Sequence, residues 1–134
     1  MRTICVARRV TTPYMVKVII DEITGGSGRD IINGGEGNDD LSGQESRDTI
    51  NGDAGDDIIN AGAGNDTVNG GDGDDEINGG SGNDVLRGDA GSDNIRGGSG
   101  DDSLVGGPSG GDTCNGQSGI DSVVASCETT NNIP

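Results

Sequence analysis

Aromatic side chains are almost absent from this 134-residue chain, which has one tyrosine and no phenylalanine, tryptophan or histidine. Only 28% of its residues are hydrophobic, so the sequence excludes a packed core of the ordinary globular kind. The formal net charge is −16. Low hydrophobicity with high net charge is typical of a chain that stays unfolded unless a ligand offsets the cost of ordering it.

Long apolar runs and an excess of basic residues are also missing. No stretch of about 18 apolar residues exists, so we expect no membrane-spanning segment. Arg8 and Arg9 interrupt the N-terminal apolar residues that a signal peptide would need. The acidic charge, most of it within residues 24–104, argues against nucleic acid and anionic membranes as partners. It favours a partner that neutralises carboxylates.

Glycine and aspartate are abundant, and they recur in a fixed phase. From Gly25 the sequence divides into nine consecutive blocks of nine residues, beginning with GGSGRDIIN and GGEGNDDLS, and two looser copies follow, GGPSGGDTCN and GQSGIDSVV. The sixth position, or its equivalent in the longer copy, is always aspartate: Asp30, Asp39, Asp48, Asp57, Asp66, Asp75, Asp84, Asp93, Asp102, Asp112 and Asp121. The eighth position of the strict blocks is always a branched aliphatic residue: Ile32, Leu41, Ile50, Ile59, Val68, Ile77, Leu86, Ile95 and Leu104.

This periodicity predicts a stack of short coils. The glycine-rich half of each block can turn tightly at positive φ. The half after the aspartate alternates outward and inward, as a very short strand with one inward aliphatic side chain. Two blocks make one coil, so aspartates of alternate blocks line opposite edges: Asp30, Asp48, Asp66, Asp84 and Asp102 on one, and Asp39, Asp57, Asp75, Asp93 and Asp112 on the other. A general preference of aspartate and glycine for turns explains the composition but not the unbroken phase.

A stack of this kind requires a cation. Adjacent parallel strands lie about 4.8 Å apart, and two carboxylates at that distance repel by roughly 3 kcal/mol at an effective dielectric constant of about 20. Calcium suits such a row because it accepts about six to eight oxygen ligands in loose geometry, whereas magnesium demands a tighter octahedron. Zinc prefers histidine or cysteine, and no repeat before Cys114 contains either.

The blocks resemble the hemolysin-type, or RTX, calcium-binding repeat G-G-x-G-x-D-x-U-x from Gly25 to about Val124. The resemblance implies an all-β fold, a right-handed parallel β-roll (β-solenoid) with about seven to nine Ca²⁺ ions in its turns. It also implies that aspartates and turn carbonyls of neighbouring coils bind each ion, so that one site would use Gly26, Gly28 and Asp30 with Asp48. All eleven aspartates are then candidate ligands, together with glycines at the second and fourth positions: Gly26, Gly28, Gly35, Gly37, Gly62, Gly64, Gly71, Gly73, Gly80, Gly82, Gly98 and Gly100.

Several turns depart from the pattern. Gln44 and Ser46 replace glycines in one block, so we expect a strained turn and weaker sites there. Asp53 and Asp89 replace the second glycine of their blocks, and Ala61 replaces a first glycine. The ninth position predicts a surface ladder of stacked asparagines: Asn33, Asn51, Asn60, Asn69 and Asn78.

Both ends differ from the repeats, which occupy residues 24–124. Residues 125–134 would form a C-terminal cap and tail. The resemblance implies a disulfide between Cys114 and Cys127, and the alternative is two small buried thiols. Residues 1–23 are either a capping segment, with residues 15–20 as a strand over the first coil, or the remnant of an upstream domain. Cys5 has no evident partner.

We therefore expect a non-catalytic calcium-binding module rather than an enzyme, because the chain lacks histidine and its carboxylates are committed to metal. The resemblance implies a secreted or surface-exposed bacterial protein in an extracellular setting, and we expect a monomer whose partners are calcium ions. Two alternatives stay open: the repeat portion of a larger secreted enzyme or toxin, and a surface adhesion or ice-binding module. The seventh positions do not form the threonine array that an ice-binding face needs.

Overall fold

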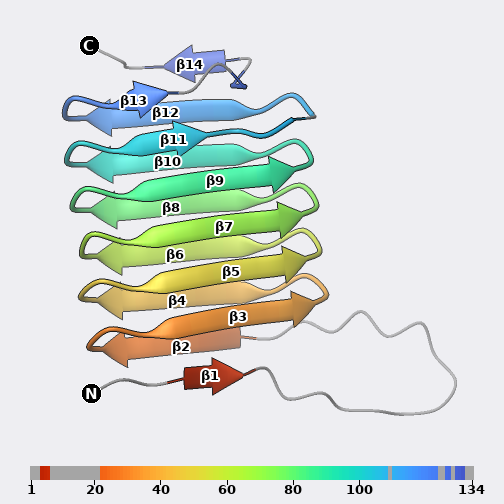
Figure 1. The fold of residues 1–134 in the computed structure, drawn as a ribbon, viewed down its shortest axis with the longest axis vertical. Coiled ribbons are helices and arrows are strands. Elements are labelled where there is room, and N and C mark those ends of the chain that lie inside the picture. Colours follow the sequence, from red (N-terminus) through yellow and green to blue (C-terminus); the bar gives the residue numbers. More distant parts are fainter. Residues whose placement is uncertain (1–3, 7–21, 109, 124–125, 128, 132–134) are drawn as a thin grey trace, which may run out of the picture.

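The structure, a computed structural model, describes residues 4–6, 22–108, 110–123, 126–127 and 129–131. Its regular elements are all β-strands, which pair in parallel as two seven-stranded sheets stacked face to face (Figure 1). The odd sheet has the order β1-β3-β5-β7-β9-β11-β13, and the even sheet β14-β12-β10-β8-β6-β4-β2. The bounds are β1 (Ile4–Val6), β2 (Glu22–Ser27), β3 (Ile31–Glu36), β4 (Asp40–Glu45), β5 (Thr49–Ala54), β6 (Ile58–Ala63), β7 (Thr67–Asp72), β8 (Glu76–Ser81), β9 (Val85–Ala90), β10 (Asn94–Ser99), β11 (Ser103–Val105), β12 (Thr113–Ser118), β13 (Ser122–Val123) and β14 (Thr129–Asn131).

Two repeat blocks make one coil, as predicted. Ile31 of β3 lies opposite Thr49 of β5, and this offset of 18 residues holds along the stack until the ten-residue block, where Asn94 lies opposite Thr113. The expected all-β parallel β-roll is therefore the fold of the chain. Its turns alternate between two edges, which lie at the left and right of Figure 1. Edge one comprises turns 25–30, 43–48, 61–66, 79–84, 97–102 and 116–121, and edge two comprises turns 34–39, 52–57, 70–75, 88–93 and 106–112.

The core is a column of aliphatic side chains between the sheets. The eighth-position residues of the nine strict blocks are only 0–1% exposed, and Cys114 takes the same place in β12. The strands are longer than predicted, six residues in most coils, because pairing continues past the first glycine to the third position of the next block. The inward face of β3 therefore holds Ile32 and Gly34. Without a side chain, this glycine leaves space for the buried aspartate of its own turn.

The turns use positive φ at their second and fourth positions. The twelve candidate glycines there have φ between +99° and +158°. Gln44, Ser46, Asp53 and Asp89 adopt the same left-handed region, at +73° to +84°. That conformation is costly for residues with a Cβ, so the strain expected in the turn of Gln44 and Ser46 is present.

The asparagine ladder is confirmed on the odd sheet. Nδ2 of Asn51 donates to Oδ1 of Asn33 at 2.8 Å, and Nδ2 of Asn69 donates to Oδ1 of Asn51 at 2.9 Å. On the even sheet, Asn60 and Asn78 lie opposite each other in the strand register. These bonds tie successive coils together on the outer face of the roll.

The two ends extend the sheets beyond the repeats. β1 pairs with β3, with Cys5 opposite Ile32, and β14 pairs with β12. Cys114 and Cys127 form a disulfide, which confirms the expected pairing. The strand expected over residues 15–20 lies outside the described residues. In the described segments, no helix has the length and apolar character needed to cross a bilayer.

Candidate metal sites

The sixth-position aspartates lie inside the roll, where each turn re-enters a sheet. All eleven are buried. On each edge, Oδ1 of one aspartate accepts a hydrogen bond from the backbone N–H of the aspartate one coil earlier, at 2.7–3.0 Å. These bonds join the aspartates into the two predicted rows, and Asp121 extends the first. Edge one has Asp30, Asp48, Asp66, Asp84, Asp102 and Asp121, and edge two has Asp39, Asp57, Asp75, Asp93 and Asp112.

The second carboxylate oxygen of these side chains is not satisfied in the same way. From Asp48 to Asp121, nine buried Oδ2 atoms have no hydrogen-bond partner within the described part of the chain. Burying a charged oxygen without a donor or a cation is strongly unfavourable. The two rows therefore need either protons or cations.

The pKa values of these carboxyl groups show the same need. Burial raises the pKa of Asp57 and of Asp84 to about 6, and that of Asp75 to about 7. The hydrogen bond from the preceding backbone N–H opposes this shift, and neighbouring carboxylates add to it. Burial likewise raises the pKa of Asp48, Asp66, Asp93 and Asp102. A divalent cation beside the carboxylates would reverse these shifts.

The glycine at the first position of each turn opens a space that the second oxygen faces. A Cβ placed on Gly43 would lie 2.5 Å from Oδ2 of Asp48 and 2.5 Å from the carbonyl oxygen of Ala61, the first residue of the turn one coil later. A Cβ on Gly79 would lie 2.6 Å from both Oδ2 of Asp84 and the carbonyl oxygen of Gly97. The space beside each first glycine is thus lined by the aspartate of its own turn. At seven of them, from Gly25 to Gly79 and at Gly97, a carbonyl oxygen of the next coil also lines it. The first glycines do not adopt the left-handed conformation, so close packing rather than the backbone angle is the reason for glycine here.

Side chains alone do not complete a site. In the segments that the structure describes, no three His, Cys, Asp or Glu side chains gather around one point. An ion would therefore take backbone carbonyls as well. Within residues 22–108, the carbonyl oxygens of Gly55, Gly64 and Gly73 accept no backbone hydrogen bond outside the sheets, so they are candidates for such ligands. Carboxylate and carbonyl oxygens in loose geometry suit Ca²⁺, so the donor set fits calcium.

Sequence reasoning missed a second row of side chains, at the fifth position of the turns. On edge two, Asn38, Asp56 and Asp74 each accept at Oδ1 a hydrogen bond from the backbone N–H of the fifth residue one coil later, at 2.8–3.0 Å. Ser92 continues the row by accepting from the N–H of Gly111. The signal was the recurrence of short acceptor side chains at this position.

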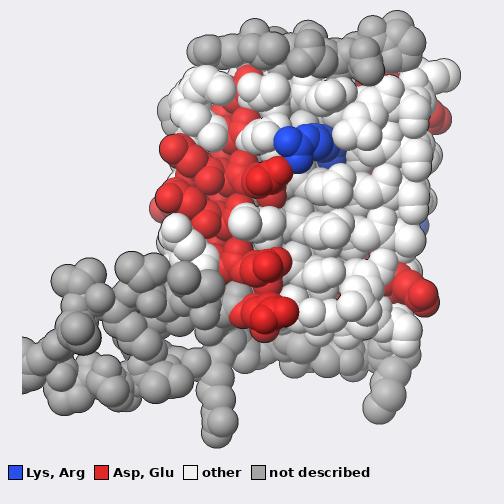
Figure 2. Space-filling model, turned by 180° about the vertical axis from the view of Figure 1, so that it is seen from behind, with Lys and Arg blue, Asp and Glu red and all other residues white. Residues whose placement is uncertain are grey.

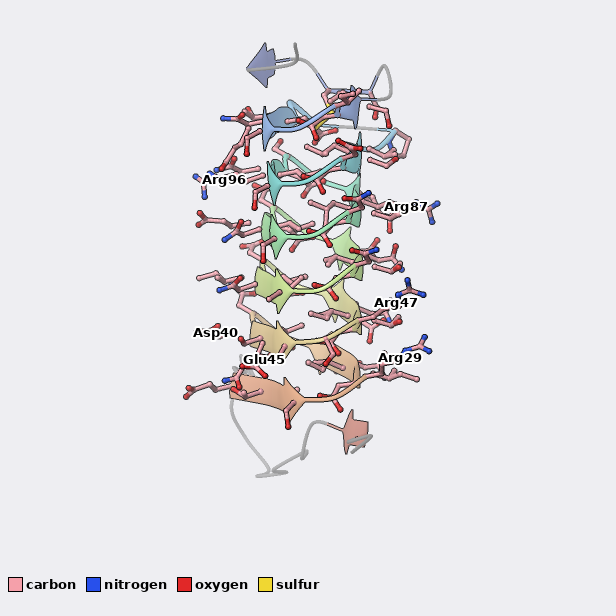
Figure 3. The ribbon with its side chains drawn as sticks, turned by 90° about the vertical axis from the view of Figure 1, so that its left-hand side faces the viewer. Arg29, Asp40, Glu45, Arg47, Arg87 and Arg96 are labelled. Carbon is pink, nitrogen blue, oxygen red and sulfur yellow. A yellow bond between two sulfur atoms is a disulfide. The ribbon has the colours of Figure 1, made fainter. Side chains whose placement is uncertain are left out.

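The outer row of edge one is shorter. It runs from Asn65 through Asn83 and Asp101 to the N–H of Ile120. The first two coils carry Arg29 and Arg47 at this position, and arginine has no acceptor. Figure 3 shows both arginines projecting outward on the same side of edge one.

The exposed charges also differ between the edges. Edge two carries six exposed acidic residues in its turns and no basic one: Glu36, Asp53, Asp56, Asp72, Asp74 and Asp89. They belong to the acidic band along one side of the roll in Figure 2. The turns of edge one carry two exposed acidic residues, Glu45 and Asp101, and two exposed arginines. Edge two therefore attracts cations more strongly.

Stacked parallel coils with a row of buried aspartates on each edge define a β-roll with oxygen-lined turns. The family model of the RTX calcium-binding nonapeptide repeat matches the chain four times, at residues 20–50, 42–77, 78–109 and 88–123. These matches cover most of the chain, which therefore belongs to the RTX calcium-binding repeat family. Comparisons with curated proteins and with solved structures gave no match.

Proposed function

We propose that this chain is a non-catalytic module that folds when calcium binds and serves a secreted or surface-exposed protein outside the cell. The observation that carries the proposal is the set of nine buried Oδ2 atoms without a hydrogen-bond partner in the described residues. Membership of a calcium-binding repeat family supports calcium as the ion that satisfies them. Without a cation, the charged carboxylates of neighbouring coils repel one another, and this repulsion opposes the stacking of the coils.

Each ion would lie between two turns of the same edge. Aspartates of both coils would supply carboxylate oxygens, and the positive-φ glycines would supply turn carbonyls. The nine aspartate pairs joined by hydrogen bonds give about nine positions, and about seven without the looser copies that contain Asp112 and Asp121. All these aspartates are buried between the sheets, where they connect successive coils. That position supports a structural rather than a catalytic role.

The extracellular setting is supported by the disulfide between Cys114 and Cys127, because disulfides persist in oxidising compartments. A calcium-poor cytosol would keep the acidic chain unfolded, and a calcium-rich exterior would fold it. The same folding role would serve an enzyme, a toxin or an adhesin joined to the module. We propose a monomer, since the stack of coils completes its own core.

The test is far-UV circular dichroism of the full chain during a calcium titration, with magnesium as the matched control. We expect a cooperative change from coil to β-structure with calcium alone, at roughly 10⁻⁴–10⁻³ M as for other extracellular calcium modules. Magnesium should have little effect, because it requires a tighter octahedron and keeps its waters. A β-signal that is already complete in chelator and unchanged by calcium would refute the proposal.

A further inference from the structure

Ala61 is an exception among the first residues of the turns. The other ten turns begin with glycine, and this one begins with a residue that carries a methyl group. Ala61 is 0% exposed and lies on edge one, between turns 43–48 and 79–84. Its methyl group is therefore inside the roll.

The neighbouring coils show what this methyl group meets. Cβ atoms placed on Gly43 and Gly79 would lie 2.5–2.6 Å from the Oδ2 atom of their own turn and from a carbonyl oxygen of the next coil. The equivalent oxygens at Ala61 are Oδ2 of Asp66 and the carbonyl of Gly79. A real Cβ does not come this close to an oxygen, so the methyl group of Ala61 displaces Oδ2 of Asp66 from the place that its counterparts occupy. That oxygen is one of the ligands proposed for the ion, and the methyl group supplies none in its place.

Edge two contains no such obstruction. Its turns all have glycine at the first position, and the four turns of normal length also have glycine at the fourth. On edge one, the coil next to Ala61 carries Ser46 at the fourth position, with φ +84°. Both departures therefore fall in adjacent coils of one edge.

We propose that the methyl group of Ala61 removes one calcium position from edge one, between turns 61–66 and 79–84. Edge one then binds calcium as an interrupted row, and edge two as a continuous row. This inference deepens the proposed function and rests on it. The chain binds one ion fewer than its count of same-edge aspartate pairs.

The decisive variant is Ala61→Gly, and Ala63→Gly is its matched control. Both substitutions remove one methyl group from the same turn, so both loosen the unfolded backbone equally. Only Ala61 is buried beside the oxygens, because Ala63 is exposed. Native mass spectrometry of the full chain in saturating calcium counts the bound ions. We expect Ala61→Gly to bind one ion more than the parent chain, and Ala63→Gly to bind the same number.

An unchanged ion count in Ala61→Gly would overturn the inference, and so would an equal gain in both variants. Gly70→Ala places a methyl group in the equivalent space on edge two, beside Oδ2 of Asp75 and the carbonyl of Gly88. It should lose one ion. If Gly70→Ala does not fold, the Ala61→Gly count decides alone. Failure of the parent chain to fold in the calcium titration would refute the proposed function, whereas a folded chain with an unchanged count refutes only the interruption.

Discussion

Edge one and edge two share the buried aspartate row, yet the side chains around that row differ. Edge two has glycine at the first position of every turn and at the fourth position of its four turns of normal length. It also has a hydrogen-bonded outer row from Asn38 to Gly111 and six exposed acidic residues. Edge one has Ala61 and Ser46 at those positions, and its outer row begins only at Asn65. The turns of the two edges thus differ in their glycines, hydrogen bonds and exposed charges, although they connect the same two sheets.

The difference separates two tasks of the nine-residue block. The sixth and eighth positions, which are the same on both edges, determine the coil, its core and its aspartate rows. The first, fourth and fifth positions determine how much room and negative potential a cation finds at each turn. Substitutions at the first, fourth and fifth positions of one edge can therefore weaken the cation sites there while the coils and their core stay the same.

The largest expected effect concerns the core that both edges share. Ile59 is 1% exposed in β6, and its neighbour Ile58 is 55% exposed in the same strand. We expect Ile59→Ala to lower the free energy of unfolding by about 2–5 kcal/mol in saturating calcium, because it leaves a cavity between the sheets. Ile58→Ala should change it by less than about 0.5 kcal/mol. Urea unfolding followed by circular dichroism measures both.

Because the core is common, Ile59→Ala should weaken the two edges together. Hydrogen exchange in calcium should show faster exchange of amides in the turns on both sides of β6. Faster exchange on edge one alone would mean that the edges are supported independently and would contradict the shared core.

The second effect compares the carboxylates of the two edges. Asp75→Asn removes one charge from the middle of edge two, and Asp66→Asn removes one from edge one beside the interruption at Ala61. We expect Asp75→Asn to raise the calcium concentration at the folding midpoint on the order of tenfold or more, since calcium affinity follows the number of charged ligands. Asp66→Asn should raise it only several-fold. Equal shifts in the circular dichroism titrations would show that the edges bind calcium alike.

A third effect is a pH dependence that calcium removes. In the absence of a bound cation, burial raises the pKa of Asp75 to about 7 and that of Asp57 to about 6, above the ordinary value of 3.8. The folded roll then binds more protons than the unfolded chain between about pH 4 and 7, so its stability falls as the pH rises through that range. Calcium affinity should rise over the same range, because calcium displaces these protons.

Far-UV circular dichroism in chelator at pH 5 and pH 7.5 measures this dependence. More β-structure is expected at pH 5. Burial raises the pKa of Asp75 on edge two and of Asp84 on edge one, so carboxyl groups of both edges contribute to this dependence. Asp75→Asn and Asp84→Asn should each reduce the pH dependence. A β-signal that grows with pH in chelator would contradict the raised pKa values of these carboxyl groups.

The fold followed from the sequence because its determinants are periodic. Aspartate at Asp30 and every equivalent position, with an aliphatic residue two positions later, predicted the coils, the core and both aspartate rows. The length of the strands did not follow, since glycines such as Gly34 read as turn residues although they continue the sheet. The space beside the first glycine was also missed, because it depends on a carbonyl from a residue 18 positions away. Contacts between coils are set in three dimensions, and a single block does not show them.

The smallest expected effect repairs the outer row of edge one. Arg47→Asn places an acceptor where the N–H of Asn65 lies one coil later, as Asn65 itself accepts from Asn83. The new hydrogen bond should raise the free energy of unfolding in saturating calcium by about 0.5–1.5 kcal/mol. Arg47→Ala removes the same positive charge without supplying an acceptor. In the parent chain, burial raises the pKa of Asp66 and the charge of Arg47 partly opposes that shift. If urea unfolding gives both variants the same stability, charge and not the missing hydrogen bond distinguishes this end of edge one from edge two.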